Sequence, residues 1–206
     1  GWSFATIDGN TTTGGRTPHQ VGFALRARVW SGALHVLYYE QDPAYGELLG
    51  WLREARFDGS SWTYQRDFRV NTIVAGKTLA IGVAGPSSVY VAYNTTFQAD
   101  PRLRWRHWNG TGWSDSTLLT EELFGDVAAD AVFVVVGGVP TLVFSDSSSD
   151  DTELFTVSGA GFTRQFAPQI GHPTSAVVVG GVASVFWGDS DPVNCCDQLL
   201  LRTTGP

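Results

Sequence analysis

Two stretches of the sequence align without a gap: LREARFDGSSW at Leu52–Trp62 and LRWRHWNGTGW at Leu103–Trp113. Each predicts a strand, a tight turn, and a second strand that opens on Trp. We expect two-residue turns here, because Asp-Gly and Asn-Gly suit hairpins whose two central residues both need φ > 0. A weaker third copy, LFTVSGAGF, occupies Leu154–Phe162. The sequence therefore contains a repeated β-hairpin.

Another predicted hairpin lies upstream of each copy. The expected strand pairs are Phe23–Trp30 with Leu34–Tyr39, Thr78–Ala84 with Val89–Tyr93, Ala131–Val136 with Thr141–Phe144, and Ser175–Val179 with Ala183–Trp187. The first strands of the last two pairs are continuously apolar, which is typical of strands buried on both faces. A four-stranded repeat of about 45 residues favours the blades of a β-propeller. A β-sandwich is the alternative, but it does not explain the repeat.

We therefore predict a single all-β domain, a four-bladed β-propeller with four antiparallel strands per blade. The blades are expected at about 20–68, 76–120, 128–167 and 174–206. The fourth repeat stops after its third strand, Gln198–Arg202, so the N-terminal strand Gly1–Ile7 should complete it, and residues 1–8 join that blade. Pairing the two ends removes sheet edges that invite aggregation. The same strand could instead insert into a neighbouring molecule and make a polymer.

Several features of the sequence predict an exported protein. There is no Met, and no apolar run is long enough for a membrane span, so we expect a secreted chain whose targeting segment has been removed. Three of the Asn residues fit the N-glycosylation pattern, although turn-forming Asn beside Thr is the alternative interpretation. These are Asn10, Asn94 and Asn109.

The net charge of −7 argues against nucleic acid and anionic membranes as partners. The charge is also unevenly distributed. Residues 1–106 hold 11 basic and 8 acidic side chains, whereas residues 107–206 hold 2 basic and 12 acidic ones. Opposite charges on opposite sides of a small disc would favour head-to-tail contacts between copies of the chain.

Acidic residues gather in the loops between the second and third strands of each repeat. These loops hold ten of the 20 carboxylates: Asp42, Glu47, Asp100, Asp146, Asp150, Asp151, Glu153, Asp189, Asp191 and Asp197. A solvated acidic surface is one interpretation. The other is a Ca²⁺ site, because hard cations prefer clustered oxygens. Its ligands would come from Asp146, Asp150 and Asp151, or from Asp189 and Asp191.

Cys195 and Cys196 are the only cysteines. In an exported protein they should be oxidised. We predict a vicinal disulfide, which is strained because adjacent Cα atoms lie about 3.8 Å apart. Two intermolecular bridges or free thiols are the alternatives.

The repeat resembles a known family. LYYE at Leu37–Glu40, LRE at Leu52–Glu54 and DGSSW at Asp58–Trp62 look like one blade of the fungal fucose-specific lectins, which are β-propellers. That family binds sugars between blades with an Arg from the second strand, a Glu from the third and an aromatic side chain. The resemblance implies that Glu54 matches the glutamate. The arginine is absent, since its positions hold Val36, Tyr90, Thr141 and Ser184, and Trp105 stands at the glutamate position of the second repeat.

A different sugar could still be bound, because aromatic faces stack on sugar rings while charged side chains fix hydroxyl groups. The candidate ligand-binding residues are Trp51, Arg53, Glu54, Trp105 and Trp187. Ordinary packing between blades is the alternative role for each of them.

From these patterns the sequence favours a secreted, non-enzymatic, lectin-like β-propeller that binds glycans. The alternative is a structural subunit that assembles with its own copies into a fibre or coat. A glycoside-acting enzyme ranks third, because no carboxylate pair is singled out among the loop acids and no catalytic motif is present. No catalytic residue is therefore assigned, and Ca²⁺ is the one cofactor considered.

Overall fold

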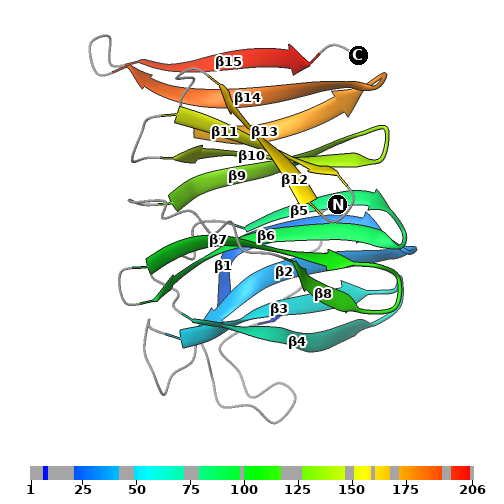
Figure 1. Ribbon diagram of the computed structural model, residues 1–206. Helices are drawn as coiled ribbons and strands as arrows, with labels where there is room; N and C mark the ends of the chain where they lie inside the picture. The colour runs from blue at the N-terminus through cyan, green and yellow to red at the C-terminus, as the bar shows by residue number, and fades with distance from the viewer. Residues whose placement is uncertain are drawn as a thin grey trace. The chain divides into compact units, whose positions relative to one another are not determined.

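The strands of the protein form four antiparallel sheets in the computed structural model (Figure 1). The structure describes residues 7–8, 21–41, 49–71, 79–97, 100–116, 127–146, 151–158, 161–167, 172–191 and 196–204. The chain divides into two compact units, Gly1–Gly76 with Thr95–Ala99 and Lys77–Asn94 with Asp100–Pro206. The first sheet belongs to the first unit, and the other three lie in the second, apart from Thr95–Phe97 in the second sheet.

Each sheet is a meander in which consecutive strands are neighbours. The first sheet contains β1 (Val21–Trp30), β2 (Ala33–Gln41), β3 (Leu49–Phe57) and β4 (Trp62–Asn71). The second contains β5 (Leu79–Gly85), β6 (Ser88–Phe97), β7 (Asp100–Trp108) and β8 (Trp113–Ser116). The third contains β9 (Val127–Val136), β10 (Val139–Asp146), β11 (Asp151–Ser158) and β12 (Gly161–Ala167). The fourth contains β13 (His172–Val179), β14 (Val182–Asp191) and β15 (Cys196–Thr204). The all-β fold and the four predicted strand pairs are confirmed.

Three of the hairpins are closed by two-residue turns in which both residues have positive φ. These turns are Ser31-Gly32 (48° and 73°), Gly137-Gly138 (58° and 80°) and Gly180-Gly181 (58° and 81°). That geometry matches the right-handed twist of the flanking strands, which is why Gly is favoured there. The turns therefore fix the register of β1–β2, β9–β10 and β13–β14.

The Asp-Gly and Asn-Gly turns differ from the two-residue type that the sequence predicts. Phe57 pairs with Trp62, so the β3–β4 loop has four residues, and only Gly59 within it has positive φ (102°). The carboxylate of Asp58 accepts bonds from the backbone N–H groups of Ser60 (2.8 Å) and Ser61 (2.9 Å). A side-chain acceptor of this kind stabilises a turn without a second left-handed residue.

Two strands of the third sheet, β9 and β10, are covered on both faces, as the apolar sequence of Ala131–Val136 predicts. On one face Ala131, Phe133, Leu142 and Phe144 pack with residues of the second sheet, including Tyr90 and Leu103. On the other face Val134 and Val143 pack with Ala183 and Val185 of the fourth sheet. Alternate residues of β9 therefore face opposite neighbours, which requires apolar side chains at successive positions.

The strand predicted to complete the fourth blade falls mostly outside the described residues. Of Gly1–Ile7 only Ile7 is described, and it packs on the first sheet against the cluster of Val36, Tyr38 and Ala55. Among the described residues the fourth sheet has three strands. Ring closure and the blade count therefore stay predictions. No helix in the described residues is long and apolar enough to cross a membrane.

Candidate functional site

The two charged residues predicted to bind a ligand, Arg53 and Glu54, are neighbours in β3 and therefore lie on opposite faces of the first sheet. Arg53 is opposite Tyr38 in the β2–β3 register, and Glu54 is opposite Leu37. Successive residues of a strand alternate between the two faces. The sheet consequently divides them between two separate polar clusters.

The first of these is the charge cluster, formed by Asp8, Tyr38, Glu40 and Arg53. Arg53 Nη1 lies 2.8 Å from Glu40 Oε2 and 3.6 Å from Asp8 Oδ2. The Tyr38 hydroxyl donates to Asp8 Oδ2 at 2.6 Å. Glu40 is 0% exposed and Arg53 is 3% exposed. One guanidinium thus serves two buried carboxylates, and the cluster holds Asp8 against the first sheet.

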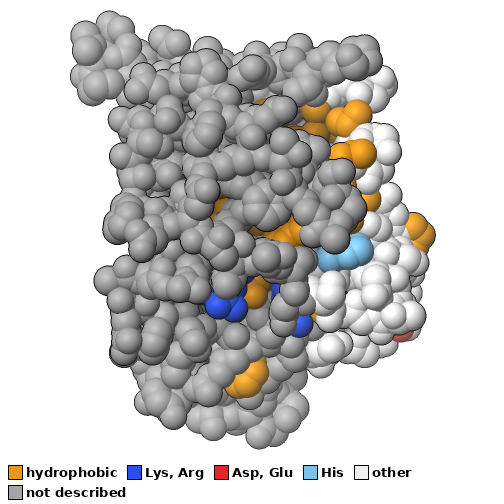
Figure 2. Space-filling view, in the orientation of Figure 1, with side chains coloured by type: hydrophobic (Ala, Val, Ile, Leu, Met, Phe, Trp, Pro, Cys, Tyr) orange, Lys and Arg blue, Asp and Glu red, His pale blue; other side chains and the backbone are white. Residues whose placement is uncertain are grey.

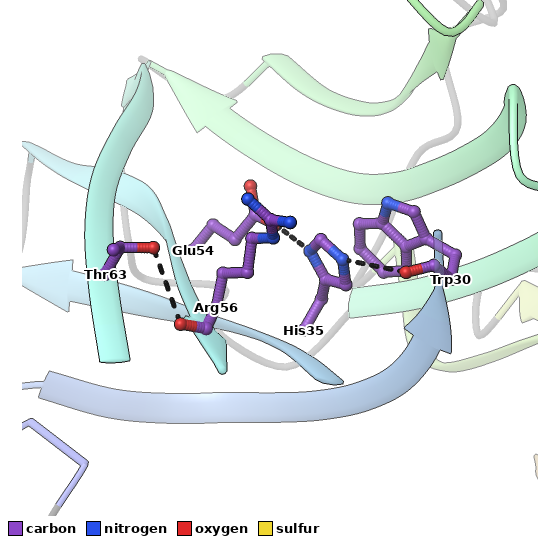
Figure 3. A network of polar contacts seen from close by, with 5 residues as sticks. All are labelled: Trp30, His35, Glu54, Arg56 and Thr63. Atoms are coloured by element: carbon purple, nitrogen blue, oxygen red, sulfur yellow. Dashed lines mark hydrogen bonds and ion pairs between the residues drawn. The ribbon is translucent and has the colours of Figure 1, made fainter. Parts of the chain in front are cut away.

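The second polar cluster contains Trp30, His35 and Glu54 (Figure 3). The imidazole of His35 stacks on Trp30 with ring centroids 3.5 Å apart and an interplanar angle of 10°. Its Nε2 lies 3.2 Å from the Trp30 carbonyl oxygen, and its Nδ1 contacts the Glu54 carboxyl group. The imidazole therefore links the Glu54 carboxyl group to the backbone at Trp30.

Of the other predicted ligand-binding residues, Trp51 is the one that shares the first sheet with these two. Trp51 is half-buried and lies opposite Glu40 in the register, so it shares a face of the first sheet with Arg53. Trp105 belongs to the second unit. Trp187 lies in β14, and its side chain is outside the described residues. Burial of both Arg53 and Glu54 favours a structural role for the pair.

An aromatic stack that the sequence analysis did not single out lies in the second unit. Tyr90 stacks with Trp105 (ring centroids 5.3 Å apart) and with His107 (4.4 Å apart). Burial lowers the pKa of His107 below its usual value of 6.5. The Nε1 of Trp105 is buried without a hydrogen-bond partner in the described part of the chain. The stack joins β6 to β7 beside the core between the second and third sheets.

The two ends of the second unit differ in character. The β9–β10 and β13–β14 hairpin turns lie at one end (Figure 1). Figure 2 shows hydrophobic side chains at the surface near that end, where Val139 and Val179 are exposed. At the opposite end lie the last residues of β10 and β14 and the first residues of β11 and β15. We call it the acidic end, defined by Asp146, Asp151, Asp189 and Asp191.

At the acidic end the backbone brings two of these residues directly together. Asp146, the last residue of β10, is opposite Asp151, the first residue of β11. In the neighbouring hairpin Asp189 is opposite Gln198, and Asp191 is opposite Cys196. The side chains of these residues, together with all of Asp150 and Cys195, are outside the described set. The Ca²⁺ site and the vicinal disulfide therefore stay predictions.

Among the residues whose surroundings the structure describes, no group of three or more His, Cys, Asp and Glu could hold a metal ion. The polar contacts described for the two clusters in the first sheet are ion pairs and hydrogen bonds. These contacts neutralise buried charge and connect Asp8, β1, β2 and β3 to one another.

No protein-family model matches the sequence, and a search of curated proteins finds no match either. Solved structures do match. A glycosyl hydrolase from Bacteroides ovatus superposes with a TM-score of 0.53 and 11% identity, covering 88% of this chain and 64% of that one. An α-L-arabinanase from Penicillium chrysogenum, complexed with arabinobiose, superposes with a TM-score of 0.52 and 11% identity. The match covers 87% of this chain and 61% of the arabinanase. The RS223 β-xylosidase superposes with a TM-score of 0.51 and 12% identity, and the match covers 87% of this chain and 69% of the xylosidase.

The chain has a β-propeller-like fold. These structures are five-bladed β-propellers, and the chain spans less than two thirds of the first of them. At identities of 11–12% the likeness shows the fold alone.

The comparison corrects the expected function. The sequence favoured a non-enzymatic, lectin-like protein, with a self-assembling structural subunit as the alternative. The matching structures instead carry the names of glycoside-acting enzymes: a glycosyl hydrolase, a xylosidase and an arabinanase. The expectation of a non-enzymatic, lectin-like protein is contradicted, and nothing in the comparisons supports self-assembly. The expectation failed because a repeat of strands and turns predicts blades, and the same blades support unrelated activities.

Proposed function

We propose that the chain is a glycoside-acting enzyme of the β-propeller class that hydrolyses xylosides, arabinosides or galactosides. The observation that supports this proposal is the match over 87–88% of the chain to structures with those named activities, including an exo-β-1,3-galactanase. The predicted affinity for glycans agrees with it, because a glycosidase must first bind a sugar.

Glycoside hydrolysis uses two carboxyl groups. One protonates the leaving oxygen, and the other acts as a nucleophile or activates a water molecule. The candidates are Asp146 and Asp151, since the register sets them opposite each other at the acidic end. Residues opposite each other in an antiparallel pair have Cβ atoms roughly 5 Å apart. The register therefore makes these two residues the carboxylate pair on which the proposal is tested.

The charge cluster of the first sheet does not supply these groups. Glu40 and Arg53 are buried, so neither can contact a sugar in the described arrangement. We infer that their role is positioning. The cluster fixes Asp8 against the first sheet.

The test is turnover of 4-nitrophenyl β-xyloside, α-arabinofuranoside and β-galactoside, together with oligosaccharides of the same sugars. The protein should be made in bacteria, so that no glycan is attached. We expect release of 4-nitrophenol or free sugar from at least one substrate. Asp146→Asn and Asp151→Asn should each lower kcat by about a hundredfold or more, because each removes a group that handles a proton or the anomeric carbon.

Asp58→Asn is the matched control. It makes the same chemical change in an exposed turn, and Asn109 shows that Asn fits this turn. Its kcat should equal that of the wild-type protein. Failure of every xyloside, arabinoside and galactoside to react would contradict the proposed activity. Turnover that survives both Asp146→Asn and Asp151→Asn would contradict the assignment of those residues.

We also infer that the four sheets are the blades of one ring, closed by Gly1–Ile7 pairing with β15. The packing of β9 against both β5 and β13 supports this inference, because first strands of adjacent blades are neighbours in propellers. Hydrogen exchange of the Gly1–Ile7 amides tests it. Protection comparable to that of β15 is expected, and free exchange of these amides would contradict closure.

A further inference from the structure

The turn between β7 and β8 holds Asn109 in a geometry fixed by its immediate neighbours. The side-chain oxygen Oδ1 of Asn109 accepts bonds from the backbone N–H groups of Thr111 (3.0 Å) and Gly112 (3.0 Å). It also accepts a bond from the Thr111 hydroxyl at 2.8 Å. The Asn109 N–H donates to the Gly112 carbonyl at 3.2 Å. These bonds span only four residues, so the turn can form before the rest of the chain folds.

The side-chain nitrogen of Asn109, Nδ2, is available for modification. All three hydrogen bonds of its side chain end on Oδ1, and Nδ2 has no hydrogen-bond partner among the described residues. Asn109, Gly110 and Thr111 are exposed. A group attached to Nδ2 would therefore enter solvent without disturbing the turn. The inner side of the turn is close-packed, since a Cβ on Gly110 would lie 2.8 Å from the Cβ of Ser87.

We propose that Asn109 is an N-glycosylation site of this protein. Asn109-Gly110-Thr111 has the acceptor pattern, and its Thr hydroxyl is bonded to the acceptor amide itself. In the transfer, Nδ2 attacks the anomeric carbon of an oligosaccharide linked to a polyprenyl diphosphate. The N–C bond forms, the bond from that carbon to the diphosphate oxygen breaks, and the diphosphate leaves with the electron pair. The Nδ2 proton passes to a base of the transferase.

The structure distinguishes this sequon from the other two. Asn94 lies within β6, and its side chain is outside the described residues, as is all of Asn10. Of the three, Asn109 is the one seen in an exposed turn. The proposal does not depend on glycosidase activity.

The first sheet supplies a matched test at the corresponding turn. Asp58 accepts bonds from the Ser60 and Ser61 N–H groups and from the Ser60 hydroxyl, just as Asn109 does from Thr111 and Gly112. Asp and Asn are therefore interchangeable as turn acceptors, but only Asn carries the nitrogen that is glycosylated. Asn109→Asp should keep the turn and remove the modification. Asp58→Asn should keep the other turn, which then reads Asn-Gly-Ser, and add a modification there.

The experiment uses the full chain, expressed with a secretion signal in a eukaryotic host. Tryptic peptides are analysed by mass spectrometry before and after peptide:N-glycosidase, which converts a glycosylated Asn to Asp. We expect a glycan on the peptide containing Asn109, its loss in Asn109→Asp and in Thr111→Ala, and a new glycan in Asp58→Asn. When both are made in bacteria and carry no glycan, the wild-type protein and Asn109→Asp should have the same Tm.

A secreted wild-type protein whose Asn109 peptide is wholly unmodified would overturn the proposal. Modification at position 58 in Asp58→Asn alongside an unmodified Asn109 would also overturn it, because the turn geometry would then be sufficient at one site and not at the other. Neither outcome bears on the glycosidase assay, which uses unglycosylated protein.

Discussion

Arg53 and Glu54 are adjacent in β3, yet their side chains engage different partners on opposite faces of the first sheet. Arg53 Nη1 lies 2.8 Å from Glu40 Oε2, whereas the Glu54 carboxyl group contacts His35 Nδ1. Both residues are less than a tenth exposed. Substitutions at the two positions should therefore change stability rather than ligand binding, and through separate networks.

Replacing Arg53 should be strongly destabilising. Arg53→Met removes the cation that lies 2.8 Å from Glu40 Oε2 and 3.6 Å from Asp8 Oδ2, and loss of one partner of a buried ion pair costs about 3–5 kcal/mol in the free energy of unfolding. The double variant Arg53→Met/Glu40→Gln should recover part of that loss, because it also removes the buried charge of Glu40. Unfolding in urea measures the free energy of unfolding of the single and the double variant. A change below about 0.5 kcal/mol in Arg53→Met would contradict the described ion pairs.

We expect Glu54 to contribute to stability and not to sugar binding. Glu54→Gln keeps the side-chain volume but weakens the bond to His35, so we expect a loss of about 1–3 kcal/mol in the free energy of unfolding. The KM for whichever glycoside is turned over should not change, since the side chain is buried. A tenfold rise in KM with unchanged stability would instead support the sugar-binding role that the lectin resemblance implies.

Gly82 should not tolerate a side chain. A Cβ at this position would lie 2.9 Å from the Cβ of Phe133, where β5 packs against β9. Gly82→Ala should lower the free energy of unfolding by about 1–3 kcal/mol, as overpacked cores do. Gly85→Ala, in the same strand, is the control, because a Cβ there meets nothing within 4 Å. Equal destabilisation by both changes would show that loss of glycine matters, rather than the close contact with Phe133.

The second unit should lose stability in mild acid. Burial lowers the pKa of His107 below 6.5, so the unfolded chain binds the proton more readily than the folded one. The stabilisation from neutral His107 is complete above pH 6.5 and is lost as the pH falls through the lowered pKa. His107→Phe keeps the stack on Tyr90 but cannot titrate. Its Tm should vary less than that of the wild-type protein between pH 7 and pH 5, and parallel curves would contradict this assignment.

The architecture was largely predictable because it is encoded locally. Gly137-Gly138 and Gly180-Gly181 are turns that need positive φ at both positions, and the apolar run at Ala131–Val136 is explained by a sheet covered on both faces. The four-residue turn at Asp58 was not predicted. There the carboxylate accepts backbone bonds, which lower the pKa of Asp58 and replace a second left-handed residue.

The site was less predictable than the strands. The repeat placed Arg53 and Glu54 side by side in the sequence, but strand alternation separates them, and their burial depends on contacts that sequence spacing does not reveal. The partners Asp8 and His35 come from distant positions in the chain. Loop acids such as Asp146 and Asp151 were recognised as a group, although nothing in the sequence selected the pair that the register brings together.

The burial of β9 and β10 on both faces bears on how the second unit unfolds. Because alternate residues of β9 and β10 support the second and the fourth sheets, loosening this middle layer exposes apolar surface on two neighbours at once. Loosening the fourth sheet exposes only one described interface. Damage to the middle layer should therefore spread in both directions, which makes that layer the element on which cooperative unfolding of the second unit depends.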